Sequence, residues 1–319
     1  MLYPVSVPKP NSAEDLIGYI DPSGRVVVPP AYEEGHYFFE GLAAVCRTDR
    51  RVGFIDEDGQ IRIPFGFAGV GRFQEGLCLG QKKLEAGYID HGGKWHIEPK
   101  FLVASEFSEG MASVSLDGET FGYVDRSGRF TIKGQFETAR RFSNGLAAVC
   151  RDGQWGYVDR TGRTLISYQF EGPRAQPFTN GLAGVCYRGR WGFIDTKGDW
   201  VIMPRYEDVR RFSEGFAPVK IDGKWGLVDF SGNTHIVCKY CELGELESGM
   251  APAALDGAAG FVSPQGAWRI SPEFDQCFRF VGALAIVRKG DAYQYIRRNG
   301  QVVWSSEPFA MVQAPPFVE

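Results

Sequence analysis

The chain has 319 residues, 44% of them hydrophobic and 14% aromatic, with 41 glycines and a formal net charge of −4. The slight acidic excess argues against a nucleic-acid-binding protein, which would carry a basic patch, and no apolar run reaches the roughly 18 residues of a membrane span. Residues 1–20 lack the basic and apolar regions of a secretory signal. Seven cysteines, an odd number, suit a reducing compartment. We therefore expect a cytoplasmic protein that binds neither nucleic acid nor membrane.

A phrase of glycine, an aromatic residue or leucine, a branched apolar residue and aspartate returns along most of the chain. Its first copy is Gly18-Tyr19-Ile20-Asp21, and its eighth copy, which begins at Gly260, has Ser263 in place of the aspartate. The glycines stand at 18, 53, 87, 122, 156, 192, 226 and 260, so successive copies are 34 to 36 residues apart. A period of this size indicates a repeat architecture in which neighbouring units bury a shared core.

Each repeat has the pattern of three short strands joined by tight turns. In the unit at 212–240, strand-like runs cover 216–221, 225–228 and the segment around Ile236. Asp222-Gly223 is a hairpin signal, and Asp229 to Gly232 is a turn in which the aspartate can bond to later backbone N–H groups. The pattern predicts a three-stranded antiparallel meander. The same turn explains the regular aspartates, which lack the further acidic ligands of a calcium loop.

A connector of about ten residues links consecutive units. It usually begins with proline, an aromatic residue and an acid, and the proline ends the third strand because it cannot donate a ladder hydrogen bond. In three connectors the acid lies four residues before an arginine: Glu137 and Arg141, Glu207 and Arg211, Asp275 and Arg279. This spacing predicts one helical turn with an ion pair.

Each unit can be recognised by the glycine that opens its first strand. The units begin near Gly41, Gly76, Gly110, Gly145, Gly181, Gly215, Gly249 and Gly282. Residues 2–30 and 294–304 match strands of the same unit, so we expect them to form a split terminal unit. The sequence thus predicts eight to nine units in a single β domain over residues 1–304. A proline-rich tail follows at 305–319.

Two recurring motifs carry a resemblance to a known family. Phrases of the type F-S-x-G-L-A-x-V are followed by Trp155-Gly156-Tyr157-Val158-Asp159 and its counterparts at 191–195 and 224–229, and this combination resembles the WG (or KWG) repeat family. The resemblance covers residues 18–304, although other residues replace the tryptophan at Val52, Ala86, Phe121 and Ala259. It implies a bacterial protein whose repeat serves interactions rather than catalysis.

A small three-stranded sheet cannot bury a face alone, so the units must stack. They can close into a β-propeller-like toroid, with the split unit as its clasp, or form an open β-solenoid. The strand segments at both ends of the chain favour closure, and we expect a monomeric ring. Small residues recur at one strand position, as close packing of sheets requires: Ala43, Ala112, Ala147, Ala183, Ala217, Ala251 and Ala285.

One cluster has the spacing of metal ligands. His235, Cys238 and Cys241 form an H-x-x-C-x-x-C sequence, and Cys277 lies near the corresponding place one unit later. Two cysteines and a histidine with a fourth ligand could complete a tetrahedral zinc site. Strand alternation would separate Cys238 from some of its partners, and free cysteine is common as a small buried hydrophobe. We therefore expect structural cysteines, without a bound metal or cofactor.

Arginine recurs immediately before the connector phenylalanine in alternate units, at Arg72, Arg141, Arg211 and Arg279. In a ring these four residues would lie at matching radial depth, where they could bind an acidic partner. The alternative is the connector ion pair described above, which is open to three of them. The tryptophans also follow the repeat, since Trp155, Trp191 and Trp225 precede its glycine. Packing explains this registration better than ligand binding does.

No sequence motif places a catalytic serine or cysteine with a histidine, and no phosphate-binding loop is present. We expect no catalytic residues and a non-enzymatic module that binds another protein, such as a partner-binding or toxin-neutralising immunity protein of bacteria. One alternative is a toroid that binds a small ligand or glycan through aromatic residues. A second is a zinc protein or enzyme centred on His235, Cys238 and Cys241. Because regular positions serve the scaffold, the irregular stretches 8–16, 170–178 and 238–246 are also candidate surfaces.

Overall fold

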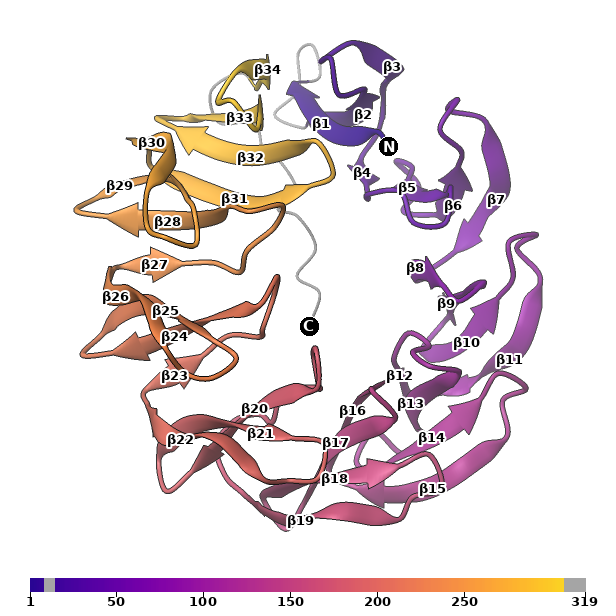
Figure 1. The fold of residues 1–319 in the computed structure, drawn as a ribbon. Helices are drawn as coiled ribbons and strands as arrows, with labels where there is room; N and C mark the ends of the chain where they lie inside the picture. The colour runs from indigo at the N-terminus through magenta and orange to yellow at the C-terminus, as the bar shows by residue number, and fades with distance from the viewer. Residues whose placement is uncertain (9–14, 307–319) are drawn as a thin grey trace. The chain divides into compact units, whose positions relative to one another are not determined.

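The computed structural model describes residues 1–8 and 15–306. These residues form 34 strands in nine antiparallel sheets, which are the blades of an all-β fold of the β-propeller class (Figure 1). Each sheet consists of strands that are consecutive in sequence. Within the described part of the chain, no helix has the length and apolarity needed to cross a membrane.

The chain divides into two compact units. Unit 1 comprises Met1–Val70 and Lys239–Glu319, and unit 2 comprises Gly71–Cys238. The sheets of unit 1 are β1 (Tyr3–Pro8), β2 (Asp15–Ile20) and β3 (Val26–Tyr32); β4 (Glu34–Gly35), β5 (Ala43–Cys46), β6 (Val52–Ile55) and β7 (Ile61–Phe67); β27 (Glu242–Leu243), β28 (Ala251–Leu255), β29 (Ala258–Val262) and β30 (Trp268–Phe274); and β31 (Gln276–Val281), β32 (Leu284–Lys289), β33 (Ala292–Arg297) and β34 (Val302–Ser305).

Unit 2 contains the remaining five sheets. They are β8 (Gly69–Gln74), β9 (Leu77–Lys82), β10 (Glu85–Ile89) and β11 (Trp95–Phe101); β12 (Val103–Ala104), β13 (Met111–Ser115), β14 (Phe121–Asp125) and β15 (Phe130–Phe136); β16 (Thr138–Ser143), β17 (Leu146–Arg151), β18 (Gln154–Asp159) and β19 (Thr164–Phe170); β20 (Leu182–Tyr187), β21 (Arg190–Asp195) and β22 (Trp200–Tyr206); and β23 (Asp208–Val209), β24 (Phe216–Ile221), β25 (Lys224–Asp229) and β26 (Thr234–Tyr240).

The predicted meander is present in every sheet, but most sheets have a fourth strand, which the connector supplies. In the sheet β16–β19, the connector residue Ala139 pairs with Val149 of β17. The predicted helical turn is therefore wrong, because residues four apart in a strand are separated by about 13 Å. The carboxylate of Glu137 instead accepts hydrogen bonds from the backbone N–H groups of Asp152 and Gly153, at 2.9 and 3.1 Å. The connector acid thus caps the hairpin turn of its own sheet.

The repeat glycine is required because the third strand passes directly over it. In the pair β14–β15, Phe121 pairs with Phe136 and Tyr123 with Ile132, so the partner strand has three residues opposite Gly122 alone. A Cβ at Gly122 would lie 2.4 Å from the carbonyl oxygen of Ile132. At all eight repeat glycines the nearest backbone atom would lie between 2.4 and 2.8 Å away. No other residue fits at this crossing without moving the strand.

The repeat aspartate builds the turn between the second and third strands, as the sequence predicts. At Asp21 one carboxylate oxygen accepts the backbone N–H groups of Ser23 and Arg25, at 2.8 and 3.1 Å. The same pair of bonds, to the second and fourth following residues, recurs at Asp56, Asp90, Asp125, Asp159, Asp195 and Asp229. The Ser23 hydroxyl, which also donates to the carboxylate, is the largest cause that lowers the pKa of Asp21 to about 2.

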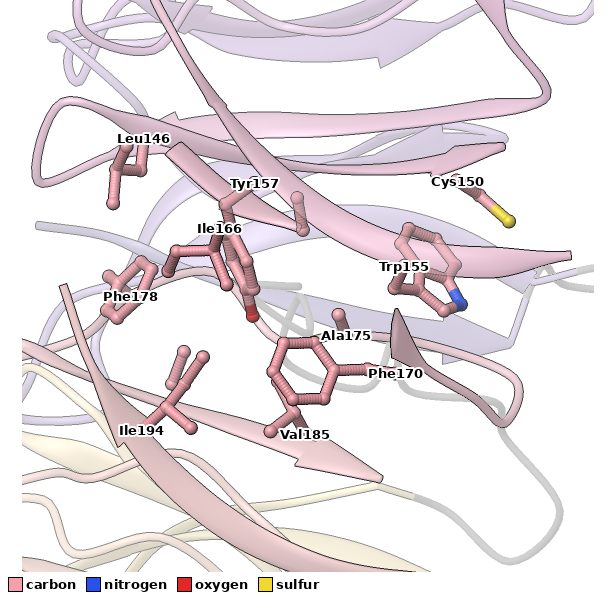
Figure 2. Packing of buried hydrophobic residues seen from close by; sticks show 12 residues of the cluster. Leu146, Cys150, Trp155, Tyr157, Ile166, Phe170, Ala175, Phe178, Val185 and Ile194 are labelled. Atoms are coloured by element: carbon pink, nitrogen blue, oxygen red, sulfur yellow. The ribbon is translucent and has the colours of Figure 1, made fainter. Parts of the chain in front are cut away.

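Neighbouring sheets bury their core between them. Between β16–β19 and β20–β22, Trp155, Tyr157 and Phe170 pack on Phe178 and Val185 (Figure 2). The recurring alanines are 0–1% exposed, as close sheet packing requires: Ala43, Ala112, Ala147, Ala183, Ala217, Ala251 and Ala285. The hydroxyl of Tyr157 donates to the carbonyl of Gln176, at 2.8 Å, in the connector that leads to the next sheet. One side chain therefore supplies both core volume and a hydrogen bond between sheets.

In unit 1 the first and last sheets of the series pack against each other. Tyr3, Tyr37 and Tyr295 lie in one buried cluster, and the hydroxyl of Tyr295 donates to the carbonyl of Pro4 at 2.8 Å. The hydroxyl of Tyr3 accepts the backbone N–H of Ala283, also at 2.8 Å. The two ends of the repeat series thus meet, as they do in a β-propeller. In an open solenoid, the alternative considered above, they would be apart.

This junction differs from the predicted split unit. Residues 2–30 belong to the sheet β1–β3, whereas residues 294–304 belong to β31–β34. The ends are joined by packing between two sheets, and not by strands shared within one sheet. Of the predicted tail at 305–319, Ser305 ends β34, Ser306 is buried, and the remainder lies outside the described residues.

We expect Gly122→Ala to lower the free energy of unfolding by at least about 2 kcal/mol, because the added methyl group would overlap the backbone of β15. Chemical denaturation of both proteins would measure this. Gly66→Ala in β7 is the matched control, since nothing lies within 4 Å of a Cβ there. Equal stability of the two variants would contradict the proposed crossing.

Tyr295→Phe should destabilise the protein by about 1–3 kcal/mol, since it leaves the carbonyl of Pro4 without its buried donor. The ring itself should fit, because phenylalanine occupies the corresponding position at Phe54, Phe193 and Phe261. Denaturant unfolding would measure the loss. As a control, Tyr293→Phe on the same strand removes a hydroxyl that bonds to no described residue and should be nearly neutral. A neutral Tyr295→Phe would contradict the role of the junction.

Acid should weaken the aspartate turns. Because the pKa of Asp21 is about 2 in the folded protein and about 4 when unfolded, the unfolded chain binds more protons between these values. The stabilisation from Asp21 is complete above about pH 5 and is lost as the pH falls toward about 2. Asp21→Asn keeps the acceptor oxygen and should flatten this decline in denaturant midpoints, whereas Asp58→Asn at an exposed position should not. An unchanged pH profile for Asp21→Asn would overturn this account.

Candidate functional site

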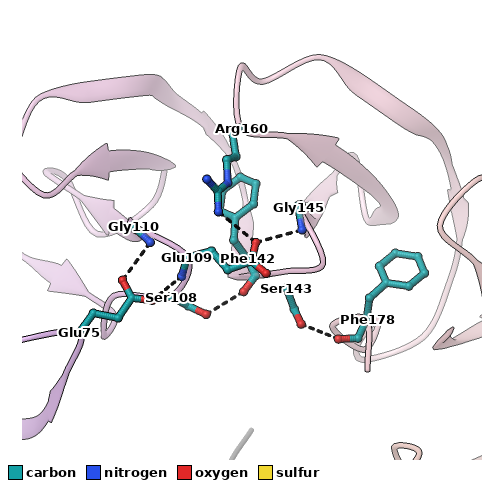
Figure 3. A network of polar contacts seen from close by, with 9 residues as sticks. All are labelled: Glu75, Ser108, Glu109, Gly110, Phe142, Ser143, Gly145, Arg160 and Phe178. Carbon is teal, nitrogen blue, oxygen red and sulfur yellow. Dashed lines mark hydrogen bonds and ion pairs between the residues drawn. The ribbon is translucent and has the colours of Figure 1, made fainter. Parts of the chain in front are cut away.

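The regular polar side chains of unit 2 are largely used to join one sheet to the next. The carboxylate of Glu75 accepts the backbone N–H groups of Glu109 and Gly110, at 2.6 and 2.9 Å, and that of Glu109 accepts the N–H of Gly145 at 2.9 Å (Figure 3). Serine hydroxyls add parallel links, from Ser108 to the carbonyl of Phe142 and from Ser143 to that of Phe178. These groups serve the scaffold and have little capacity left for a ligand.

The predicted arginines occupy a different kind of position, where the connector leaves the regular ladder. In β16 the pairing jumps from Ala139 to Phe142, so Arg140 and Arg141 form a β-bulge. In unit 1 the pairing of β31 jumps in the same way, and Arg279 lies in that bulge. A bulge re-aims the side chains that it contains. Arg141 and Arg279 thus lie at a structurally special point of the repeat, where the residue type varies between units.

The two arginines of the β16 bulge have different surroundings. The guanidinium of Arg140 lies over the ring of buried Trp155, 5.8 Å from its centre. Arg210 lies over Trp225 in the same way, at 4.8 Å. These cation–π contacts were not predicted from the sequence, although each tryptophan follows its arginine at a constant distance of 15 residues. Arg140 and Arg210 therefore belong to the scaffold.

Three of the predicted arginines are brought together in unit 2. Arg141 is half-buried, and burial, followed by the nearby charges of Arg211 and Arg72, lowers the pKa of its guanidinium. Glu106 acts in the opposite direction on Arg141. The carboxylate of Glu106 lies 3.6 Å from the Nε atom of Arg72, whose side chain is 18% exposed. The cluster of Arg72, Arg141 and Arg211 with Glu106 is the candidate functional site, and we call it the arginine cluster.

The strands that carry this cluster lie at one edge of their sheets. β8 and β16 are edge strands, and Arg211 follows the edge strand β23. In unit 2 the strands β8, β12 and β16 lie on the concave side, and β11, β15 and β19 on the convex side (Figure 1). Arg279, the fourth predicted residue, belongs to unit 1, where it lies near Tyr37. Within unit 2, the structure therefore groups Arg72, Arg141 and Arg211 with Glu106.

The metal candidates form no comparable group. Among the described residues, no three histidine, cysteine, aspartate or glutamate side chains are placed to hold a metal ion. His235 bonds to Asp229 at 3.2 Å, and the thiol of Cys238 donates to the carbonyl of Val219. Cys277 packs at the edge of a hydrophobic cluster in unit 1, and Cys241 is exposed.

The tryptophans and the irregular connector also serve packing. Trp155, Trp191 and Trp225 are only 4–5% exposed. In the connector at 170–178, the guanidinium of Arg174 stacks on Trp191 and pairs with Asp208 at 2.8 Å. Residues 9–14 of the predicted surface at 8–16 lie outside the described residues, and Leu243 and Leu246 in the segment 238–246 are buried.

Unit 1 has a depression of about 630 Å³ between its first and last sheets. Its lining includes Arg297 and Arg298, but both guanidinium groups have partners. Arg297 donates to the carbonyl of Pro22 and to Gln301, and Arg298 to the carbonyls of Ser248 and Gly282. The bond from Arg297 to Pro22 joins the first and last sheets, and the other bonds stay within the last sheet or reach the preceding one. Because both guanidinium groups are engaged, the depression is a weaker candidate than the arginine cluster.

Solved structures share this fold at low sequence identity. The chain is similar to a eukaryotic initiation factor (TM-score 0.69, 12% identity, 98% of each chain covered). It is also similar to the computationally designed Ika8 protein (TM-score 0.54, 14% identity, 84% of this chain and 96% of that one). A third similar structure is BamB from Moraxella catarrhalis (TM-score 0.50, 12% identity, 77% and 89%). At these identities the likeness concerns the fold alone.

No match was found among curated protein sequences. The WG-containing repeat matches the chain seven times, at residues 17–49, 53–82, 87–119, 121–155, 155–191, 191–225 and 260–293. The unmatched interval between 225 and 260 includes His235, Cys238 and Cys241, where the repeat is irregular. The repeat and the propeller fold suggest a scaffold of the protein-interaction type. The matches span most of the sequence, and the chain belongs to the family of WG-repeat proteins.

Proposed function

We propose that this chain is a non-enzymatic scaffold that binds another protein through the arginine cluster of unit 2. The observation that carries the proposal is a contrast between two kinds of polar position. Side chains that recur in each repeat are engaged in turns, caps and links between sheets. The arginines vary between repeats, and they gather cationic charge at the edge strands. Conserved geometry with locally varied charge suits recognition of a partner.

The environments of the histidines agree with a role outside catalysis. His235 bonds to a turn aspartate, His96 to the carbonyl of Arg126, and His91 stacks on Phe73. Each of these rings has a structural neighbour in place of a nucleophile. The burial of the motif tryptophans likewise disfavours a glycan site, which would need exposed aromatic faces.

The more specific form of the proposal is a monomeric bacterial protein of the cytoplasm that neutralises a toxin. A protein partner is expected, and neither nucleic acid nor a membrane, because the formal net charge of the chain is −4. An inhibitor of this type needs a rigid surface, since a preorganised partner loses little entropy on binding. The cores between the sheets supply that rigidity.

Affinity capture from an extract of the source organism tests the function. We expect the tagged protein to retain one partner in stoichiometric amount through gel filtration with light scattering. The matched control is the triple variant Arg72→Gln, Arg141→Gln, Arg211→Gln, which should retain less of it. If a toxin is the partner, co-expression with this chain should restore growth.

Two outcomes would contradict the proposal. One is the absence of any stoichiometric protein partner, together with a rise in melting temperature when a sugar is added, which would favour the glycan-binding alternative. The other is about one equivalent of zinc in the purified protein, which would direct attention to His235, Cys238 and Cys241. Elemental analysis measures the second directly.

A further inference from the structure

Arg141 is the residue of the arginine cluster whose surroundings leave it open to a ligand. No described residue offers its side chain a hydrogen bond or an ion pair, although the side chain is half-buried. Arg72 lies before it and Arg211 after it, on alternate sheets of unit 2. Its neighbour Arg140, in the same bulge, lies over Trp155. Two adjacent arginines thus differ in function: one is packed and the other is available.

The position of Arg141 is fixed by the backbone around it. The hydroxyl of buried Tyr123 donates to the carbonyl of Arg140 at 2.6 Å, which anchors the bulge to the core between two sheets. Equivalent tyrosine bonds fix the connectors at His36 and Ser105. The bulge therefore does not depend on the guanidinium of Arg141 for its shape. The backbone that carries the Arg141 side chain is thus held by bonds that do not involve its guanidinium.

Electrostatics makes this placement unfavourable in the absence of an anion. Arg141 loses part of its hydration on burial, and two like charges lie within reach. Glu106 relieves Arg72, at 3.6 Å, more directly than it relieves Arg141. A bound carboxylate would compensate both the lost hydration and the repulsion. Sites that are destabilised in this way are characteristic of binding functions.

We propose that Arg141, flanked by Arg72 and Arg211, receives the carboxylates of an acidic peptide segment of the partner protein. This inference rests on the proposed function and names the chemistry that the partner must present. A guanidinium binds a carboxylate through two parallel N–H donors. Arg141 supplies these donors, and the charges of Arg72 and Arg211 nearby add attraction for further acidic side chains of the same segment.

An acidic peptide fits the cluster better than a phosphate group does. Phosphate sites commonly combine a cation with several free backbone N–H groups, at a helix N-terminus or in a nest. The described residues contain no helix. The neighbouring connector N–H groups are already used, as Ser105 donates to the carbonyl of Ser113 and Arg210 to that of Pro218. The cluster therefore offers guanidinium groups without the usual backbone cradle for phosphate.

The test is binding of fluorescein-labelled hexaglutamate to the full chain, measured by anisotropy. We expect saturable binding that weakens with added salt, and no binding of labelled hexaglutamine. Arg141→Gln should weaken hexaglutamate binding about tenfold, which corresponds to the loss of one charge-assisted hydrogen bond. Inorganic phosphate and pyrophosphate are tested as competitors at equal ionic strength and should compete poorly.

Two matched variants and a second measurement separate recognition from structure. Arg140→Gln removes the packed arginine of the same bulge, and Arg190→Gln removes an exposed arginine at a hairpin of unit 2. Neither should change hexaglutamate affinity beyond the small effect of one lost charge. In low salt, Arg141→Gln should melt at the same or a higher temperature than the parent protein, while Arg140→Gln should melt lower. A structural role for Arg141 would give the opposite result.

The inference is overturned if hexaglutamate binds the parent and Arg141→Gln equally, or if Arg141→Gln melts at a lower temperature. Binding of pyrophosphate alone, with the same dependence on Arg141, would replace the acidic peptide with a phosphate ligand. A partner captured equally by the parent and Arg141→Gln would remove the cluster from recognition and leave the scaffold function standing. If the peptide binds in an Arg141-dependent way but no partner is captured, the acidic-peptide site stands and the proposed scaffold function is contradicted.

Discussion

The crossing of the third strand over the repeat glycine is the constraint on which each sheet depends. At Gly122 the backbone of β15 passes so close that a side chain has no room, and three residues of that strand oppose one of β14. The connector that follows β15 forms β16, the first strand of the next sheet. There the hydroxyl of Tyr123, the next residue of the motif, anchors the connector through the carbonyl of Arg140. Glycine and tyrosine thus act together: the glycine has no side chain to obstruct the crossing, and the tyrosine hydroxyl extends to the next connector.

The polar side chains that recur in the repeat are engaged by the backbone of the turns and of the next sheet. Turn aspartates satisfy backbone donors within a sheet, and Glu75 and Glu109 satisfy donors in the next sheet. Buried or half-buried N–H groups require such partners, so these positions tolerate little change. The bulge is different, because its backbone is fixed by the hydrogen bond from the Tyr123 hydroxyl to the carbonyl of Arg140. The residue that follows the anchored carbonyl can vary in charge without loss of the fold.

The sequence predicts the local turns well, because Asp-x-x-Gly and Asp-Gly signals act over a few residues. It predicts the fourth strand poorly. Glu137 and Arg141, four residues apart, fit a helical turn, and only the pairing of Ala139 with Val149 shows that the segment is extended. The split terminal unit failed for a related reason: strand patterns do not distinguish two packed sheets from one shared sheet. The arginines could be identified by their repeat position, but their proximity depends on how sheets stack, which no local pattern records.

The charges of the arginine cluster interact between sheets that share no strand pairing. Arg72 is on the sheet β8–β11, Arg141 on β16–β19, and Arg211 follows the first strand of β23–β26. The charges of Arg72 and Arg211 repel that of Arg141, and the cores between the sheets must outweigh this unfavourable interaction. Acidic side chains bound at Arg141 would relieve the repulsion and stabilise the folded protein by mass action. Unit 2 can therefore keep a cationic cluster on a chain whose formal net charge is −4, because the cores between its sheets, and not an ion pair at Arg141, stabilise the fold.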